Sequence, residues 1–176
     1  SGTRYTTDAL IIATGAQAKW LGLPSETALK GFGVSACATC DGFFFKGKKV
    51  AVVGGGNTAV EEALFLTNFA SEVTLIHRRD SLRADKTNQK RLLDHPKTKV
   101  IWNAEVAEVL GGGDPKTVTG VKVKNILSGE VSSHALDGLF IAIGHNPATE
   151  IFKGHLDMDS EGYIRTAPDS TKTSVA

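Results

Sequence analysis

The chain has 176 residues, which fits one large domain or one domain with part of a second. Its 20 lysines and arginines against 19 aspartates and glutamates leave a net charge of +1, which argues against a broad nucleic-acid or membrane-binding surface. Hydrophobic residues make up 41% and charged residues 22%, as in a globular α/β chain, and no apolar run approaches the ~20 residues that span a bilayer. We therefore expect neither nucleic acid nor membrane as a partner.

Cysteine usage bears on the cellular compartment. Only 2 cysteines occur, too few for the disulfide framework of a small secreted domain. They stand three positions apart, as Cys37 and Cys40, which fits the redox pair of a cytosolic protein. The polar residues 1–7 do not resemble a signal peptide. The sequence thus favours a cytoplasmic location.

The first element expected in chain order is a buried strand over residues 9–13, a continuous apolar run that Thr14 and Gly15 close with a turn. Runs of this kind are typical of parallel sheets covered on both faces. Because no earlier residues supply partner strands, we expect the rest of that sheet to lie on sequence outside this chain. Residues 17–33, with Pro24 and several glycines, predict a linker.

An α/β unit is expected next. Residues 58–70 predict a helix, because small apolar residues recur there at helical spacing and form one stripe that packs closely on a sheet. The other elements expected of this unit are strands over residues 49–53, 73–76 and 100–102, and a mainly polar helix within residues 81–94.

The pattern changes after residue 104 to looser alternation interrupted by glycine-rich turns, which predicts an antiparallel meander. A second buried run over residues 138–143 then ends at Gly144 and resembles the run at 9–13, so the two suggest paired nucleotide-binding domains. Residues 145–147 are expected to begin a loop. The strands expected here cover residues 105–110, 118–124 and 131–136, with a short one at 162–164.

A glycine loop stands between the strand at 49–53 and the following helix. The pattern Gly54-x-Gly56-x-x-Ala59 in this context matches the dinucleotide-binding fingerprint. One glycine makes the tight turn, a second lets backbone N–H groups approach the pyrophosphate, and the alanine lets the helix pack against the strand. The helix N-terminus adds positive potential for a phosphate. The alternative is a glycine-rich turn without a ligand.

Basic residues at the end of the next strand bear on the choice of nucleotide. An acidic residue there binds the ribose 2′-hydroxyl of NAD, whereas arginine favours the 2′-phosphate of NADP. The sequence has His77-Arg78-Arg79 at this place, with Arg83 soon after, and forked guanidinium groups match phosphate oxygens. Asp80 lies one residue too late for the NAD role. We therefore predict NADPH; a solvated basic turn is the alternative.

The thiol pair lies in an expected helical turn that brings both sulfurs within bridging reach. A helix N-terminus makes the first thiol, Cys37, the better nucleophile, and Asp41 beside Cys40 is placed to exchange a proton. A zinc site would need about four ligands, and the sequence has no second cysteine pair and no histidines at ligand spacing, so we expect no metal. A buried, inert thiol pair remains an alternative. A thioredoxin-type domain does not fit, because a glycine fingerprint follows the pair.

Residues 37–44, 54–63 and 77–84 closely resemble the bacterial-type, low molecular weight thioredoxin reductase family, and the resemblance covers essentially the whole chain. It implies a homodimeric flavoprotein in which electrons pass from NADPH to FAD, then to the active disulfide and on to thioredoxin. By this analogy Cys40 faces the flavin, Cys37 exchanges with the thioredoxin disulfide, and Asp41 handles the proton.

The resemblance also implies the nucleotide ligands. The 2′-phosphate set is His77, Arg78, Arg79 and Arg83. The complete set of predicted cofactor-binding residues is Gly54, Gly55, Gly56, Asn57, Thr58, His77, Arg78, Arg79, Arg83, Ile143 and Gly144.

The expected fold is α/β. It comprises a Rossmann-like, three-layer NADPH-binding domain over residues 20–147, with a parallel sheet and an antiparallel β-meander, and FAD-domain segments at residues 1–19 and 148–176. The family's amino-terminal FAD fingerprint is absent, so we expect a truncated piece that is inactive alone, with FAD bound only by the complete protein. The alternatives are a related flavin-dependent disulfide reductase that serves a peroxiredoxin, and a nucleotide-binding or docking module without chemistry of its own.

Overall fold

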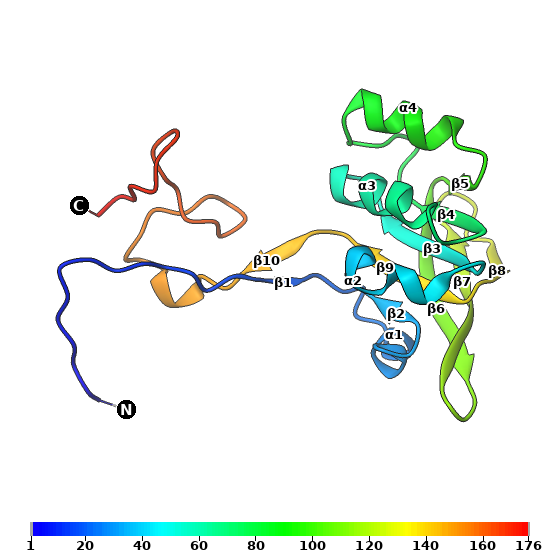
Figure 1. Cartoon of the computed structure of the whole chain (residues 1–176), viewed down its shortest axis with the longest axis horizontal. Coiled ribbons are helices and arrows are strands. Elements are labelled where there is room, and N and C mark those ends of the chain that lie inside the picture. Colours follow the sequence, from blue (N-terminus) through cyan, green and yellow to red (C-terminus); the bar gives the residue numbers. More distant parts are fainter. Residues whose placement is uncertain (1, 176) are drawn as a thin grey trace. The chain divides into compact units, whose positions relative to one another are not determined.

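The computed structural model describes residues 2–175, which divide into two compact units. The larger unit is Ala18–Gly144, and the smaller one comprises the described residues up to Gln17 and from His145 onward. At the centre of the larger unit is a five-stranded parallel sheet in the order β2-β9-β3-β4-β5 (Figure 1). Its strands are β2 (Val34–Ser35), β3 (Lys49–Gly54), β4 (Glu72–Ile76), β5 (Thr98–Ile101) and β9 (Gly138–Ala142).

Helices cover one face of this sheet and a second sheet covers the other. The helices α3 (Asn57–Leu66) and α4 (Lys86–Asp94) lie on the same side (Figure 1). The opposite face packs against a three-stranded antiparallel sheet of β6 (Ala104–Gly112), β7 (Thr117–Asn125) and β8 (Val131–Ala135). The expected three-layer α/β fold with a parallel sheet and a meander is therefore confirmed.

The two faces of β3 show why these residues form a central strand. Val50 and Val52 pack in the core beneath α3, while Ala51 and Val53 pack against the meander. All four side chains are at most 8% exposed. Side chains of successive strand residues point to opposite faces, so a strand buried on both faces must be apolar throughout. Burying a valine in this way contributes roughly 1.5–3 kcal/mol.

The segment expected to be a linker contains a helix. Helix α1 (Pro24–Leu29) begins with Pro24, whose fixed φ and missing N–H suit the first helical position. The Glu26 carboxylate is fully buried and accepts the N–H groups of Leu21 at 2.9 Å and Gly22 at 3.0 Å. Residues 17–33 are thus an ordered part of the larger unit, and the linker prediction was wrong.

The smaller unit contains three further corrections. Residues 9–13 form no strand, and Leu10 and Ile11 are 72% and 90% exposed, because no strand within the described residues pairs with this segment. Residues 145–147, expected as a loop, form strand β10 (His145–Pro147), which pairs with β1 (Ala16–Ala18). The short strand expected at 162–164 is only a single bridge between Met158 and Ile164.

Two helices of the larger unit are shorter than the periodicity predicts. Helix α3 ends at Leu66, where the Thr67 hydroxyl donates to the Leu64 carbonyl at 2.6 Å. Helix α4 begins at Lys86 because Asp85 is its N-cap, and the carboxylate of Asp85 accepts the N–H of Asn88 at 2.9 Å. Side-chain bonds to the backbone set both ends.

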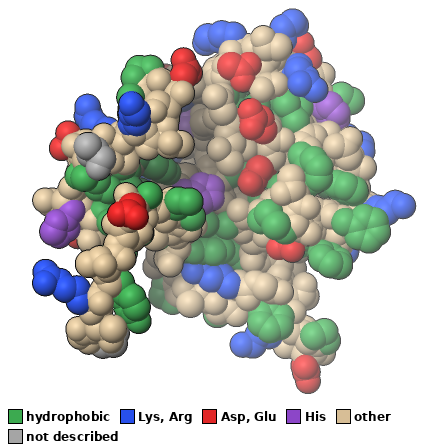
Figure 2. All heavy atoms as spheres, turned by 60° about the vertical axis from the view of Figure 1, so that its left-hand side comes forward, with side chains coloured by type: hydrophobic (Ala, Val, Ile, Leu, Met, Phe, Trp, Pro, Cys, Tyr) green, Lys and Arg blue, Asp and Glu red, His purple; other side chains and the backbone are tan. Residues whose placement is uncertain are grey.

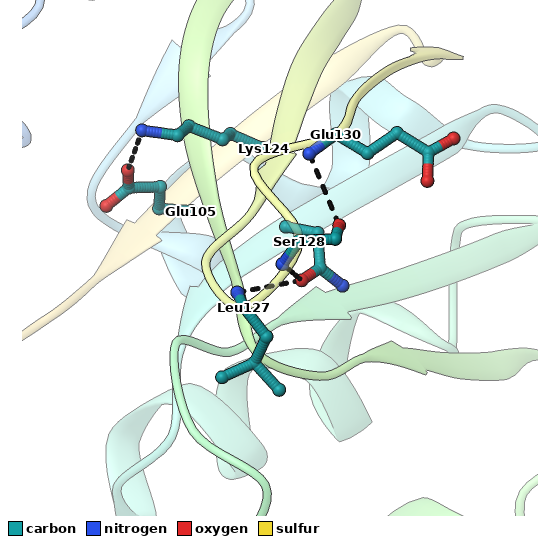
Figure 3. Close-up of polar contacts among 6 residues, drawn as sticks. Glu105, Lys124, Leu127, Ser128 and Glu130 are labelled. Carbon is teal, nitrogen blue, oxygen red and sulfur yellow. Dashed lines mark hydrogen bonds and ion pairs between the residues drawn. The ribbon is translucent and has the colours of Figure 1, made fainter.

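The turn between β7 and β8 is closed by its own side chains (Figure 3). The Asn125 side-chain oxygen accepts the N–H of Ser128 at 3.0 Å, and the Ser128 hydroxyl accepts the N–H of Glu130 at 3.2 Å. Lys124 and Glu105 lie 3.8 Å apart across β6 and β7. That ion pair is half exposed and is worth at most about 1 kcal/mol. The turn is therefore held mainly by the Asn125 and Ser128 hydrogen bonds.

Acidic and basic side chains are interspersed over the face shown in Figure 2, in keeping with the net charge of +1. Over residues 2–175, the helices are all too short or too polar to cross a membrane.

Candidate functional site

A cleft of about 730 Å³ lies at the carboxyl ends of β3, β4 and β9 in the larger unit. The chain proceeds from β3 toward β4 on one side, whereas β9 lies on the other side, so the strand order reverses at this point. In open α/β sheets, ligands bind outside the carboxyl ends of the strands at such a reversal. Of the predicted cofactor residues, the cleft is lined by Gly54, Gly55, Gly56, Thr58, His77, Arg78, Arg83, Ile143 and Gly144.

Each glycine of the loop has a different reason to lack a side chain. Gly54 has φ +153°, and a Cβ there would lie 2.6 Å from the Ala59 Cβ and would overlap the Ala142 carbonyl oxygen. A Cβ on Gly55 would overlap the imidazole of His77. Gly56, the N-cap of α3, has nothing within 4 Å of the place where its Cβ would stand. Gly54 and Gly55 therefore serve packing, while Gly56 leaves open space before the helix N-terminus.

His77 lies beneath this loop, close enough to Arg78 and Arg79 for their charges to act on it. Its side chain is 5% exposed, its Nε2 lies 3.0 Å from the Ser81 carbonyl oxygen, and its ring packs against Gly55. Burial lowers the pKa of His77 from its usual value of 6.5. A direct contact between His77 and a 2′-phosphate stays a prediction, whereas its position favours support of the glycine loop.

The buried imidazole predicts how stability changes with pH. Since the pKa of His77 is lowered in the folded chain, the unfolded chain binds the proton more tightly. The contribution of His77 to the free energy of unfolding should therefore fall as the pH drops below about 6.5. In urea titrations between pH 5 and 8, the free energy of unfolding of the wild type minus that of His77→Gln should decrease as the pH falls, whatever the constant offset in stability between them. His155→Gln, at an exposed position, is the control and should keep the wild-type slope; an unchanged slope in His77→Gln would contradict the prediction.

The arginines differ in their places. Arg78 and Arg83 line the cleft, and the backbone N–H of Arg83 donates to the Gly55 carbonyl at 2.8 Å, which ties this segment to the loop. Arg79 is exposed but does not line the cleft. Asn57 is also outside the lining, because its side-chain oxygen accepts the N–H of Asp85 at 2.7 Å. Asn57 thus connects the start of α3 to the start of α4.

The cysteines form a disulfide at the start of a short helix on the same unit. Cys37 and Cys40 are bonded, with their Cα atoms 5.3 Å apart, and Cys37 is the N-cap of α2 (Ala38–Asp41). The Cys40 N–H lies 3.2 Å from the Cys37 Sγ, and the Ser35 hydroxyl accepts the Cys37 N–H at 3.0 Å. Cys40 is exposed and Cys37 is partly exposed. The bond is therefore accessible to another thiol.

Asp41 follows the disulfide at the end of α2 and is partly exposed. The 3₁₀ turn η1 (Gly42–Phe45) then anchors the segment, because Phe45 packs edge-on against Phe140 with ring centroids 5.3 Å apart. Gly138 makes room for the Phe45 ring, which a Cβ would overlap. This packing fixes the redox turn against β9, an inner strand of the parallel sheet.

Comparison with known proteins identifies the family to which the chain belongs. The family model described as pyridine nucleotide-disulphide oxidoreductase matches residues 1–176. The chain belongs to this family. Thioredoxin reductase of Rickettsia felis is 56% identical to this oxidoreductase chain over 175 residues, which are 99% of the chain and 56% of the relative. Thioredoxin reductase of Coxiella burnetii is 59% identical over 164 residues, 92% of the chain and 51% of the relative.

Solved structures agree with this membership. The oxidoreductase chain superposes on thioredoxin reductase of Giardia duodenalis with a TM-score of 0.83 at 40% identity, over 96% of the chain and 54% of that structure. For Lactococcus lactis thioredoxin reductase the TM-score is 0.80 at 40% identity, over 92% and 52%. The resemblance to thioredoxin reductases is thus confirmed, and the chain spans little more than half the length of these relatives.

One residue with an unusual environment was not predicted from the sequence. Glu62 of α3 is half-buried beside the redox helix, and its Oε2 is buried without a hydrogen-bond partner among the described residues. Burial raises the pKa of Glu62 to about 7, and a backbone hydrogen bond from Ala38 partly offsets that rise. The available signal was a second glutamate, after Glu61, beside the small apolar residues of the helix.

Proposed function

We propose that this chain carries the NADPH-binding and disulfide part of a thioredoxin reductase. In the complete protein, electrons would pass from NADPH through FAD to the Cys37–Cys40 disulfide and then to thioredoxin. The observation that carries the proposal is an accessible disulfide at a helix start on the same folded unit as a glycine-loop cleft lined by arginines. The similarity to thioredoxin reductases over nearly the whole chain supports it.

The proposal assigns different parts of the chain to two domains. We place the NADPH-binding domain at residues 20–147 and segments of an FAD-binding domain at residues 1–19 and 148–176. The boundaries of the two compact units, after Gln17 and after Gly144, lie close to these limits and support them. We also propose a homodimer for the complete protein and, from the redox pair, a cytoplasmic location.

The cleft has the features that NADPH needs. Open space in front of Gly56 lets the pyrophosphate approach the N-terminus of α3, where unpaired backbone N–H groups favour an anion. Arg78 and Arg83 would hold the 2′-phosphate, and Arg79 would add charge from outside the lining. The bound nucleotide would supply the hydride. His77 would keep the loop in shape from below.

The disulfide exchange is carried out by Cys37, Cys40 and Asp41 of this chain. After reduction, the Cys37 thiolate attacks one sulfur of the thioredoxin disulfide, and the other thioredoxin sulfur leaves and takes a proton from Asp41. Cys40 then gives its proton to Asp41 and attacks the Cys37 sulfur, so that the Cys37–Cys40 bond forms again. The second thioredoxin sulfur leaves and takes that proton from Asp41. Two thiols are oxidised and two are produced, so electrons and protons balance.

The activity is tested on the complete protein, which includes the sequence outside this chain. Purified with FAD and mixed with NADPH and thioredoxin, it should release two thioredoxin thiols for each NADPH oxidised. Without thioredoxin in the mixture, no thiols should be released. A complete protein that oxidises NADPH but reduces a peroxiredoxin and not thioredoxin would overturn the choice of partner.

The arginine arrangement predicts selectivity for the phosphorylated nucleotide. Arg78→Gln removes one charge-assisted bond to the 2′-phosphate, worth about 1.5–3 kcal/mol, so NADPH affinity should fall by about 10–100-fold. NADH lacks that phosphate, so its affinity should hardly change. Calorimetric titration of both nucleotides into the chain measures this.

The matched control is Arg91→Gln on α4, which lies outside the cleft and should leave both affinities unchanged. An equal loss for NADPH and NADH in Arg78→Gln would contradict the phosphate assignment and leave only a general electrostatic effect.

A further inference from the structure

Glu62 connects helix α3 to the redox turn. Helices α2 and α3 pack against each other, and the Glu62 carboxyl receives a backbone hydrogen bond from Ala38, the first residue of α2. Ala38 directly follows Cys37, the N-cap and disulfide partner. The other carboxyl oxygen, Oε2, is buried and has no hydrogen-bond partner among the described residues. The carboxyl therefore lies at the amide of Ala38, directly after Cys37.

Among residues 2–175, no cation balances this carboxyl. On the elements that pack around α3, β9 and η1 carry no charged side chain, α2 carries Asp41, and α3 itself carries only Glu61 besides Glu62. None of the charged groups nearby shifts the pKa of Glu62, which is set by burial and by the Ala38 hydrogen bond. The remaining charged residues on neighbouring elements are Lys49 of β3, Glu72 of β4, and Lys86, Lys90, Arg91 and Asp94 of α4.

The position of Glu62 affects the Cys37–Cys40 pair once its disulfide is reduced. The Cys37 sulfur already lies 3.2 Å from the Cys40 N–H, so a thiolate formed there would be stabilised by an amide of the same short helix whose first residue, Ala38, faces Glu62. Two negative charges at neighbouring amides of one turn disfavour each other. Groups that interact this closely titrate as a pair, so a proton gained by one favours the charged form of the other.

We propose that Glu62 is a positioning residue of the redox pair, which holds the first turn of α2 through the Ala38 amide and takes up a proton when the Cys37–Cys40 bond is reduced. This inference rests on the proposed function, in which reduced flavin supplies the electrons. Two electrons break the sulfur–sulfur bond and two protons are taken up. One proton goes to a cysteine sulfur and the other to the ionised Glu62 carboxylate, so the second sulfur stays a thiolate.

The thiol titration of the chemically reduced chain tests this. The chain is reduced with a phosphine, and thiolate absorbance is followed between pH 5 and 10. Glu62→Gln removes the competing negative charge, so the thiolate should appear at a pH lower by about one unit than in the wild type. Glu61→Gln, one position along the same helix but exposed, is the matched control and should titrate as the wild type does. Superposable curves for Glu62→Gln and Glu61→Gln would overturn the proposal.

A measurement on the wild type covers the case in which Glu62→Gln fails to fold. The Glu62 side-chain carboxyl is followed by carbon-13 NMR in the oxidised and the reduced chain. Its titration midpoint should move to higher pH on reduction, and an unchanged midpoint would contradict proton uptake. Neither experiment contains NADPH, FAD or thioredoxin. If the complete protein fails to reduce thioredoxin, the thiol and carboxyl titrations therefore keep their meaning. If the titrations contradict the role of Glu62, thioredoxin reduction by the complete protein is not thereby contradicted.

Discussion

Replacing Gly54 with alanine is expected to be the most destabilising single change in the glycine loop. With φ at +153°, this residue occupies a region that side chains rarely adopt, which costs about 1–3 kcal/mol. The new Cβ would also press on Ala59 and on the Ala142 carbonyl, and such overpacking costs about 1–3 kcal/mol more. The sum is a large share of the ~5–15 kcal/mol that stabilises a typical domain. Urea denaturation should show a much lower midpoint or no folded baseline.

Gly56→Ala is the matched control, two residues away. Its φ of −92° suits alanine and the space in front of it is open, so the free energy of unfolding should change by less than about 0.5 kcal/mol. NADPH affinity should nevertheless fall, because the new methyl group stands where the pyrophosphate approaches. Wild-type stability in Gly54→Ala would contradict the packing argument. Wild-type affinity in Gly56→Ala would contradict the phosphate site.

The layered fold was predictable because its sequence signals are local. Continuous apolar runs such as β9 identify strands buried on both faces, and loose alternation separated by glycine turns identifies the meander. The small residues Ala59 and Ala63 are fully buried against the sheet, as the stripe indicated. These patterns need no knowledge of distant partners, so the types of the central strands, the meander strands and the helices α3 and α4 were right even where the ends were not.

Two segments were mispredicted because their structure depends on contacts that the local sequence pattern does not show. The run at residues 9–13 has the composition of a buried strand, but a strand exists only where another backbone pairs with it, and the described residues offer none. The segment 17–33 looked like a linker because proline and glycine dominate it. Its order comes from Glu26, whose buried carboxylate bonds to two backbone amides, a contact that no periodicity reveals.

The sequence predicted which residues meet at the nucleotide cleft, but it did not predict how His77 and Glu62 are oriented. Spacing alone brought the glycine loop, Arg78 and Arg83 to one cleft. The sequence could not show that His77 points inward beneath Gly55, because a strand end allows either face. It also gave no sign that Glu62 reaches α2, because that contact depends on how two helices pack.

Cys37→Ser and Cys40→Ser should each reduce thioredoxin turnover by the complete protein at least about a thousandfold, because each removes one of the two sulfurs that exchange. Both variants should still bind NADPH with wild-type affinity, because the disulfide and the nucleotide cleft are formed by different residues. Turnover is measured as thioredoxin thiols released per NADPH consumed.

The two variants should differ in what they trap. Cys40→Ser keeps the attacking Cys37 but lacks the thiol that resolves the mixed disulfide, so incubation with oxidised thioredoxin after phosphine reduction and its removal should yield a covalent complex on a non-reducing gel. Cys37→Ser should yield much less, because Cys37 is the sulfur that lies at the first-turn amides of α2. More complex from Cys37→Ser than from Cys40→Ser would reverse the assignment of the attacking sulfur. No complex from either variant, with NADPH binding intact, would refute thioredoxin as the partner of this disulfide.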